Sequence, residues 1–189
     1  MAGIVLSDRQ RLDWRKRLMY LPDQPPVFPL STPLGHLASL VKLYEAEREG
    51  LESLLVAVLG ELDLLPLAEC PIRTLSRGQA YKTALATLLA VDPQLWLLDE
   101  PFAAGMDPQG HAVLRRYASK ATARGATVIY TTQMLELAEQ FADYVLILDG
   151  GRLHAFDRVS NLPAAGSLGN GANHGVLERI FAQLRTGAV

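Results

Sequence analysis

Two adjacent carboxylates, Asp99 and Glu100, follow a short apolar run at residues 95–98 and stand directly before Pro101. A buried strand that ends in such a pair delivers it to the sheet edge where open α/β sheets bind ligands. Asp99 can hold Mg²⁺ there, because this ion is usually bound by one or two carboxylates together with substrate phosphates. Glu100 points in a different direction and can polarise a water for attack on a phosphate. A strand that merely ends at an Asp-Glu-Pro turn has the same sequence, so the pair alone leaves both interpretations open.

A short loop, Leu-Ser-Arg-Gly-Gln at residues 75–79, precedes an Ala- and Leu-rich helix predicted for residues 80–90. Ser76 offers a hydroxyl, Gly78 lets the backbone approach closely, and the helix presents its first amides. These features predict an anion site, although an ordinary serine-capped helix reads the same way. Asp99 follows Gln79 by 20 residues, across one helix, and this spacing favours the anion site over coincidence.

Together the two segments resemble the signature loop and the Walker B strand of ABC-type ATPases, the nucleotide-binding domains of ATP-driven transporters. Further segments match the same family in chain order, so the resemblance extends over essentially the whole chain. They are a Q-loop at residues 20–24, a D-loop at 102–107, a switch loop at 130–133 and, at 177–181, a helix similar to the terminal helix of the export-type groups.

The resemblance implies roles for particular residues, with ATP and Mg²⁺ as the ligands. Asp99 would bind the Mg²⁺, Glu100 would be catalytic, and Gln133 would stand at the switch position. Asp107 would contact the dimer partner. The residues that would bind a nucleotide held by that partner are Ser76, Arg77, Gly78 and Gln79.

The implied partners are a second ABC ATPase subunit, in a homodimer or heterodimer, and a transmembrane permease subunit, without nucleic acid. The chain would then be cytoplasmic and peripheral on the inner face of the cell membrane, held there by its membrane partner.

The sequence departs from the family pattern at three places, and these departures affect the roles that the resemblance implies. No Gly-x-x-x-x-Gly-Lys-Ser/Thr occurs in the 189 residues, so the backbone cradle for the β-phosphate, its lysine and the Mg²⁺-binding hydroxyl are missing. Gln133 stands where the family has a histidine, and an amide cannot change its protonation state near pH 7. Asp23 falls at the Q-loop glutamine, with Gln24 one place late, and either could meet a metal or water.

Two hypotheses of different classes follow from the resemblance. The first is the ATPase subunit of an export-type ABC transporter, in a chain short of its N-terminal portion and unable to bind or hydrolyse ATP alone. The second is a non-catalytic regulatory or structural subunit that lends its signature loop to a complete partner ATPase. DNA-repair and translation-factor ATPases share the loop, but they need long coiled-coil insertions or a second cassette, which 189 residues do not accommodate.

Strands and helices must alternate to position these residues. Strands are expected at residues 18–21, 95–98, 127–131, 144–148 and 152–156, with a mostly helical insertion at about 31–75. The core strands are apolar runs, which favour a parallel sheet covered on both faces. The expected fold is a P-loop-NTPase-like α/β domain at residues 1–156, with a mostly parallel sheet, helices on both faces and its N-terminal strands and P-loop missing. A flexible linker at 157–175 and a C-terminal helix at 176–189 would follow.

Composition agrees with one globular core. The chain is 49% hydrophobic and 20% charged, with a net charge of -2, which gives no overall attraction to nucleic acid or anionic membrane. Its single cysteine, Cys70, excludes an internal disulfide framework and fits a reducing compartment. No apolar run approaches the roughly 20 residues that a membrane-spanning helix needs.

Overall fold

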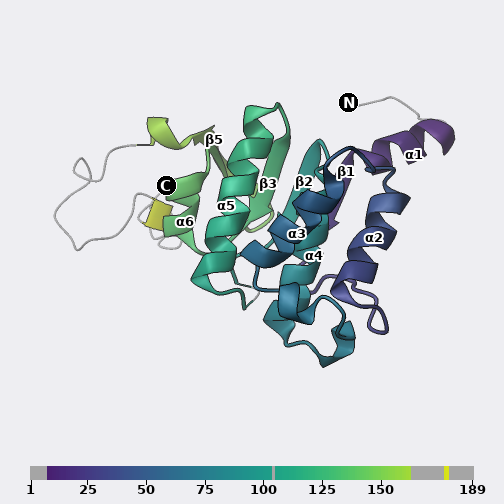
Figure 1. Ribbon diagram of the computed structural model, residues 1–189. Helices are drawn as coiled ribbons and strands as arrows, with labels where there is room; N and C mark the ends of the chain where they lie inside the picture. Colours follow the sequence, from purple (N-terminus) through teal and green to yellow (C-terminus); the bar gives the residue numbers. More distant parts are fainter. Residues whose placement is uncertain (1–7, 104, 163–176, 179–189) are drawn as a thin grey trace. The chain divides into compact units, whose positions relative to one another are not determined.

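The computed structural model describes residues 8–103, 105–162 and 177–178 of the chain. It divides into two compact units, Met1–Thr131 (unit 1) and Thr132–Val189 (unit 2). Unit 1 contains a three-stranded sheet with its helices, and unit 2 contains a strand pair and helix α6 (Figure 1).

The sheet of unit 1 is parallel, as its apolar runs predict. Its strands are β1 (Leu18–Leu21), β2 (Leu95–Asp99) and β3 (Thr127–Thr131), in the order β1-β2-β3. Asp99 is in register with Thr131 on β3. Because parallel strands end on the same edge, the carboxyl ends of all three strands lie together.

Helices of unit 1 pack on one face of this sheet. Helix α4 (Arg77–Val91) contacts β1, and helix α5 (Pro108–Ala123) contacts β3. The side chains of the strands alternate accordingly, with Trp96 buried on the covered face and Tyr20 and Ile129 55% and 54% exposed on the other. The predicted α/β fold with a parallel sheet and packed helices is thus confirmed, and α4 and α5 lie on the same side of the sheet, which the apolar runs alone do not reveal.

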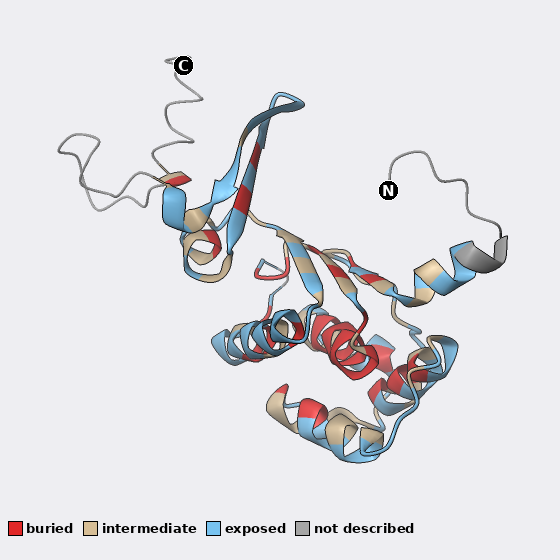
Figure 2. Ribbon diagram, turned by 90° about the horizontal axis from the view of Figure 1, so that it is seen from above, coloured by how far each residue is buried: buried red, intermediate tan, exposed pale blue. Residues whose placement is uncertain are grey.

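The helical insertion packs on α4 from the side away from the sheet. It consists of α2 (Pro33–Leu43), α3 (Leu51–Glu61) and two short 3₁₀ turns, Leu65–Leu67 and Ile72–Thr74. As a result α4 is buried along most of its length (Figure 2). Local signals fix the start of α2, because Thr32 caps the helix through its hydroxyl and Pro33 occupies the first turn.

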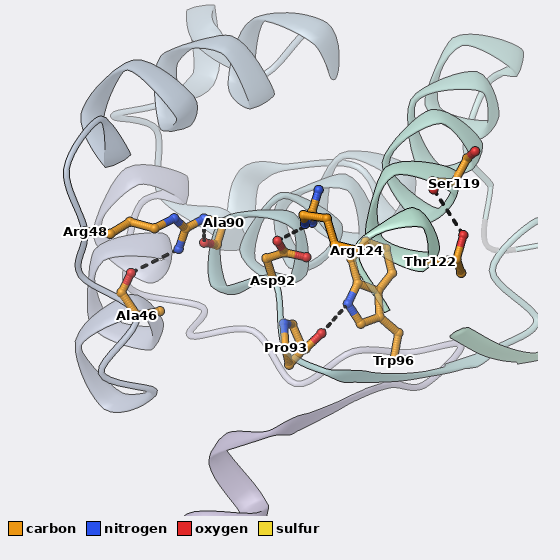
Figure 3. A network of polar contacts seen from close by, with 9 residues as sticks. All are labelled: Ala46, Arg48, Ala90, Asp92, Pro93, Trp96, Ser119, Thr122 and Arg124. Carbon is orange, nitrogen blue, oxygen red and sulfur yellow. Dashed lines mark hydrogen bonds and ion pairs between the residues drawn. The ribbon is translucent and has the colours of Figure 1, made fainter. Parts of the chain in front are cut away.

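Polar contacts fix the C-terminal end of α4, at the sheet end opposite to Asp99 (Figure 3). Asp92 ends the helix in the left-handed conformation, with φ +52°. Arg48 donates to the Ala90 carbonyl at 2.9 Å, which satisfies one of the last helical acceptors. Arg124, just after α5, forms an ion pair with Asp92. These contacts tie the insertion and α5 to the central helix.

Unit 2 contains α6 (Leu135–Phe141) and the antiparallel strands β4 (Tyr144–Asp149) and β5 (Arg152–Arg158). Its small core is made of Ala138, Val145, Ile147 and Leu177. β5 extends two residues beyond the expected position 156, and a 3₁₀ turn follows at Val159–Asn161. The rest of the expected linker and most of the expected C-terminal helix lie outside the described residues, so those limits stay a prediction.

Candidate functional site

The loop at residues 75–79 forms the start of α4. The helix begins at Arg77, three residues earlier than expected, because Ser76 and Gln79 form a reciprocal capping box. The Gln79 backbone N–H donates to Ser76 Oγ at 3.2 Å, and the Ser76 N–H donates to Gln79 Oε1 at 2.9 Å. The Ser76 hydroxyl is thus an acceptor in the cap and keeps its own proton for donation to a ligand. Ser76 is exposed, so the first turn of a 15-residue helix faces solvent with its amides preorganised.

Gly78 lies against the turn that follows β2. A Cβ atom at Gly78 would lie 2.4 Å from the carbonyl oxygen of Gly105, closer than any real contact allows. Gly105 itself has φ +77°. Only glycine fits at this contact between the start of α4 and the turn, and the expected role of Gly78 at an anion site stays a prediction. Ala104, in the expected D-loop, lies outside the described residues.

Asp107 is the N-cap residue of α5 and binds with both carboxylate oxygens. Oδ1 accepts from the Gly110 N–H at 2.8 Å, and Oδ2 accepts from the Lys82 ammonium at 2.6 Å. The hydrogen bond from Lys82 is the main cause that lowers the pKa of Asp107, followed by that from Gly110. Lys82 is not among the residues that the sequence motifs predict for the site. The available signal was a lone charge inside the otherwise uncharged stretch 78–91.

Asp99 lies where the three strands end and accepts hydrogen bonds from both neighbouring strands. The Thr131 hydroxyl donates to Oδ1 at 2.7 Å, and the Tyr20 hydroxyl lies 3.3 Å from Oδ2. Tyr81, on α4, is 1% exposed. Burial raises the pKa of Tyr81, and the negative charges of Asp23 and Asp99 add to this effect. The expected metal residue is therefore held in place by two hydroxyl groups that its own motif does not contain.

Glu100 adopts a left-handed backbone conformation, with φ +46°. Its N–H donates to the backbone carbonyl of Thr131 at 3.2 Å. This turn sends the chain away from the strand direction immediately after Asp99. The roles of Asp99 as metal ligand and Glu100 as a separate base stay a prediction.

Asp23 and Gln24 both line one pocket of about 280 Å³ beside α4. One nitrogen of the Arg77 guanidinium lies 2.7 and 2.9 Å from the two oxygens of Asp23. The loop after β1 is thereby joined to the first helical residue of α4. Asp23 thus already has a cationic partner, and the Q-loop role of Asp23 or Gln24 stays a prediction.

Gln133 belongs to unit 2, on the segment before α6. There the Met134 N–H donates to the Thr132 hydroxyl at 3.0 Å. The switch-position role of Gln133 stays a prediction.

A bound Mg²⁺ would have to use few protein ligands. The part of the chain that the structure describes contains no group of three or more His, Cys, Asp or Glu side chains able to share a metal ion. Mg²⁺ in nucleotide sites uses one or two carboxylates and completes its shell with phosphates and water. Asp99, hydrogen-bonded and partly exposed at the strand end, fits that requirement.

No helix within the described residues is long and apolar enough to cross a membrane.

Comparisons with known proteins agree on one family. A sequence model described as ABC transporter matches residues 1–103. The chain is 30% identical over 154 residues to the energy-coupling factor transporter ATP-binding protein EcfA of Carboxydothermus hydrogenoformans, covering 81% of the chain and 57% of that protein. It is 28% identical over 149 residues to the ABC-type transporter ATP-binding protein EcsA of Bacillus subtilis, covering 79% and 60%. It is 32% identical over 136 residues to the cytochrome c biogenesis ATP-binding export protein CcmA of Pseudomonas syringae, covering 69% and 62%. The chain thus spans about three fifths of the length of these relatives.

Solved structures show the same fold. An ATP-binding subunit of an ABC transporter superposes with a TM-score of 0.82 at 23% identity, covering 94% of this chain and 72% of that one. A dimeric ATP-binding cassette in a post-hydrolysis state with ADP and Pi superposes with a TM-score of 0.68 at 23% identity, covering 84% and 72%. The resemblance found in the sequence is confirmed: the chain belongs to the ABC transporter family, as one of its ATP-binding domains.

Proposed function

We propose that this chain serves the ATP-driven step of membrane transport, together with a second ABC ATP-binding subunit and a transmembrane permease that holds it at the cytoplasmic face. The observation that carries the proposal is the capped first turn of α4. Ser76 and Arg77 are exposed there, and Ser76 is the N-cap of a 15-residue helix. Such a turn binds phosphate groups presented by another molecule.

The residues divide the work as follows. Ser76 and its neighbours Arg77, Gly78 and Gln79 bind the phosphates of a nucleotide held by the second subunit, while the Gln79 backbone N–H stays engaged in the helix cap. Asp99 binds Mg²⁺, which neutralises developing phosphate charge when bound. Glu100 orients and deprotonates the attacking water. Asp107 contacts the second subunit.

We further propose that this 189-residue chain does not turn over ATP alone. Its sequence contains no lysine-bearing glycine loop for the β- and γ-phosphates. The Ser76 turn instead acts on a nucleotide that the second subunit holds, across the subunit interface.

The second candidate function is a non-catalytic subunit that contributes only the Ser76 turn. The ion pair between Asp23 and Arg77 favours it, because a carboxylate paired with a guanidinium is less able to serve a nucleotide in its own subunit. Gln133, which cannot carry a proton at this position, points in the same direction.

Phosphate release by the assembled transporter distinguishes the two candidates. The complex would be purified through a tag on this chain and placed in vesicles with Mg-ATP. If the chain is a catalytic subunit, Glu100→Gln lowers turnover by about 10²-fold or more, whereas the control Glu52→Gln, exposed on α3, leaves it unchanged. If it is non-catalytic, Glu100→Gln has no effect but Ser76→Arg, which fills the anion site, abolishes turnover. Turnover that neither change affects contradicts both, and hydrolysis by the chain alone that Glu100→Gln removes contradicts the need for a second subunit.

A further inference from the structure

Lys82 is a buried cation inside the central helix. Its side chain is 8% exposed, although α4 is otherwise lined with apolar and small residues over its buried stretch. An ammonium taken out of water is costly unless it is paired and hydrogen-bonded. Its partner is Asp107, 25 residues later, with Nζ 2.6 Å from Oδ2. Removal of one partner of such a pair leaves a buried or misdirected charge, which makes the pair a strong constraint on geometry.

Two further contacts lie at the same junction. Gly78 and Lys82 are four residues apart on α4 and therefore share one helix face. Gly78 is in contact with the carbonyl of Gly105, so that no side chain fits between them. A Cβ atom at Gly110, in the first turn of α5, would lie 3.4 Å from Lys82 Cε, which shows that the lysine stem packs against that turn. The start of α4 and the segment 105–110 are thus in contact at two places about one helical turn apart, at Gly78 and at Lys82.

Asp107 connects this junction to the surface. Its side chain is 49% exposed even though both oxygens are engaged, one with Gly110 and the other with Lys82. The carboxylate is therefore oriented by a buried group and still available at the surface. Ser76 is exposed at the start of the same helix that carries Lys82.

We propose that Lys82 is a positioning residue: it locks the 105–107 turn to the start of α4, so that Ser76 and Asp107 meet a second ATP-binding subunit as one rigid surface. The consequence for a second subunit rests on the proposed function. The lock itself concerns only this chain and can be tested without nucleotide. Loss of the ion pair between Lys82 and Asp107 leaves Asp107 able to cap α5 but frees the 105–107 turn from α4.

The first experiment measures the lock in the isolated chain. Lys82→Met keeps the stem and removes the charge, Lys82→Arg keeps the charge, and Lys42→Met on the exposed side of α2 is the matched control. In Lys82→Met we expect amides of segment 105–110 to exchange hydrogen at least about tenfold faster, and the carboxyl carbon of Asp107 to titrate at higher pH by NMR. Lys82→Arg should restore both values. Asp107→Asn, which preserves the cap, covers the case in which Lys82→Met does not fold, since it must release the same amides if the lock exists.

The second experiment measures the consequence in the assembled transporter. Lys82→Met should raise the KM for ATP and lower turnover, with rescue by Lys82→Arg and no change in Lys42→Met. If exchange and titration do not change in Lys82→Met, the lock is disproved whatever the transporter does. If they change but KM and turnover stay as in the native complex, the positioning role is disproved. A complex without ATP turnover of any kind contradicts the proposed function and leaves the first experiment to decide the lock.

Discussion

At the residue scale, the Ser76 hydroxyl has two separable jobs, because it accepts a hydrogen bond within the cap and is proposed to donate one to phosphate. Ser76→Ala removes both, and we expect the free energy of unfolding to fall by about 1 kcal/mol. Ser76→Asp keeps an acceptor at the N-cap, where a negative charge also favours the helix dipole. It should retain stability but abolish ATP turnover in the assembled complex, since the anion site becomes anionic. Urea unfolding and phosphate release measure the two effects, and a stable, active Ser76→Asp complex would refute the phosphate role.

One buried and one half-buried histidine, His36 and His111, predict acid sensitivity of unit 1. Burial lowers the pKa of His36, and it is also the main cause that lowers the pKa of His111. A lowered pKa means that the unfolded chain binds protons first as pH falls below 6.5. Stability from neutral histidine is therefore complete above that pH and is lost as pH falls towards the folded-state pKa.

The free energy of unfolding should accordingly decrease as the pH is lowered from about 7.5 to 5.5, by at most about 1.4 kcal/mol per pH unit for His36 and by less for the more exposed His111, and the midpoint of thermal unfolding should decrease with it. Replacing the exposed His154 by glutamine should leave this slope unchanged. A midpoint that stays constant or rises over the range would contradict the assignment.

At the element scale, the contact between α4 and the turn at Gly105 makes Gly78 intolerant of any side chain. The added methyl group in Gly78→Ala meets a backbone oxygen, which cannot move aside as a side-chain tip can. We expect a loss of about 1–3 kcal/mol, typical of overpacking.

Gly60→Ala is the matched comparison, because its methyl group would meet the flexible tip of Leu65 at 3.2 Å inside α3. There alanine gains up to about 1 kcal/mol of helix propensity, so the change should be neutral or stabilising. Chemical unfolding of both variants decides the matter, and equal effects would show that the Gly78 contact is not constraining.

The sequence predicts most elements because each carries a local signal. Apolar runs mark the strands of unit 1, and Asp107 followed by Pro108 marks the start of α5. The start of α4 is the instructive error: residues 77–79 are not apolar, so hydrophobic periodicity begins only at Ala80, whereas the pair Ser76 and Gln79 is a capping-box signal that outweighs it.

At the scale of the whole molecule, burial is concentrated in one helix. α4 is contacted by α2 and α3 as well as by the sheet, and its residues from Tyr81 to Val91 are buried. β5, in contrast, is exposed at nearly every position (Figure 2). We expect α4 and β2 amides to exchange hydrogen slowest and β5 amides to exchange much faster, because slow exchange requires opening of the core. Mass spectrometry on peptic peptides measures this, and equal protection of β5 and α4 would contradict the distribution of the core.

The candidate site was predictable only in part, for reasons of distance along the chain. Asp99 and Glu100 follow from a local pattern at one strand end. Tyr20 and Thr131, which donate to Asp99, lie 79 and 32 residues from it in sequence, and only the parallel strand order brings them together. Lys82 and Asp107 meet through packing of two helices, which no spacing rule encodes.

The left-handed backbone at Glu100 lowers the stability of the fold at the residue whose carboxylate is proposed to be catalytic. A glutamate in that conformation costs about 1 kcal/mol or more, whereas glycine adopts it freely. Replacement by glycine would therefore relax the turn and make the protein more heat-resistant while deleting the carboxylate. Directed evolution that selects only for heat resistance would therefore replace Glu100, so a selection for a more stable protein must also require transport activity.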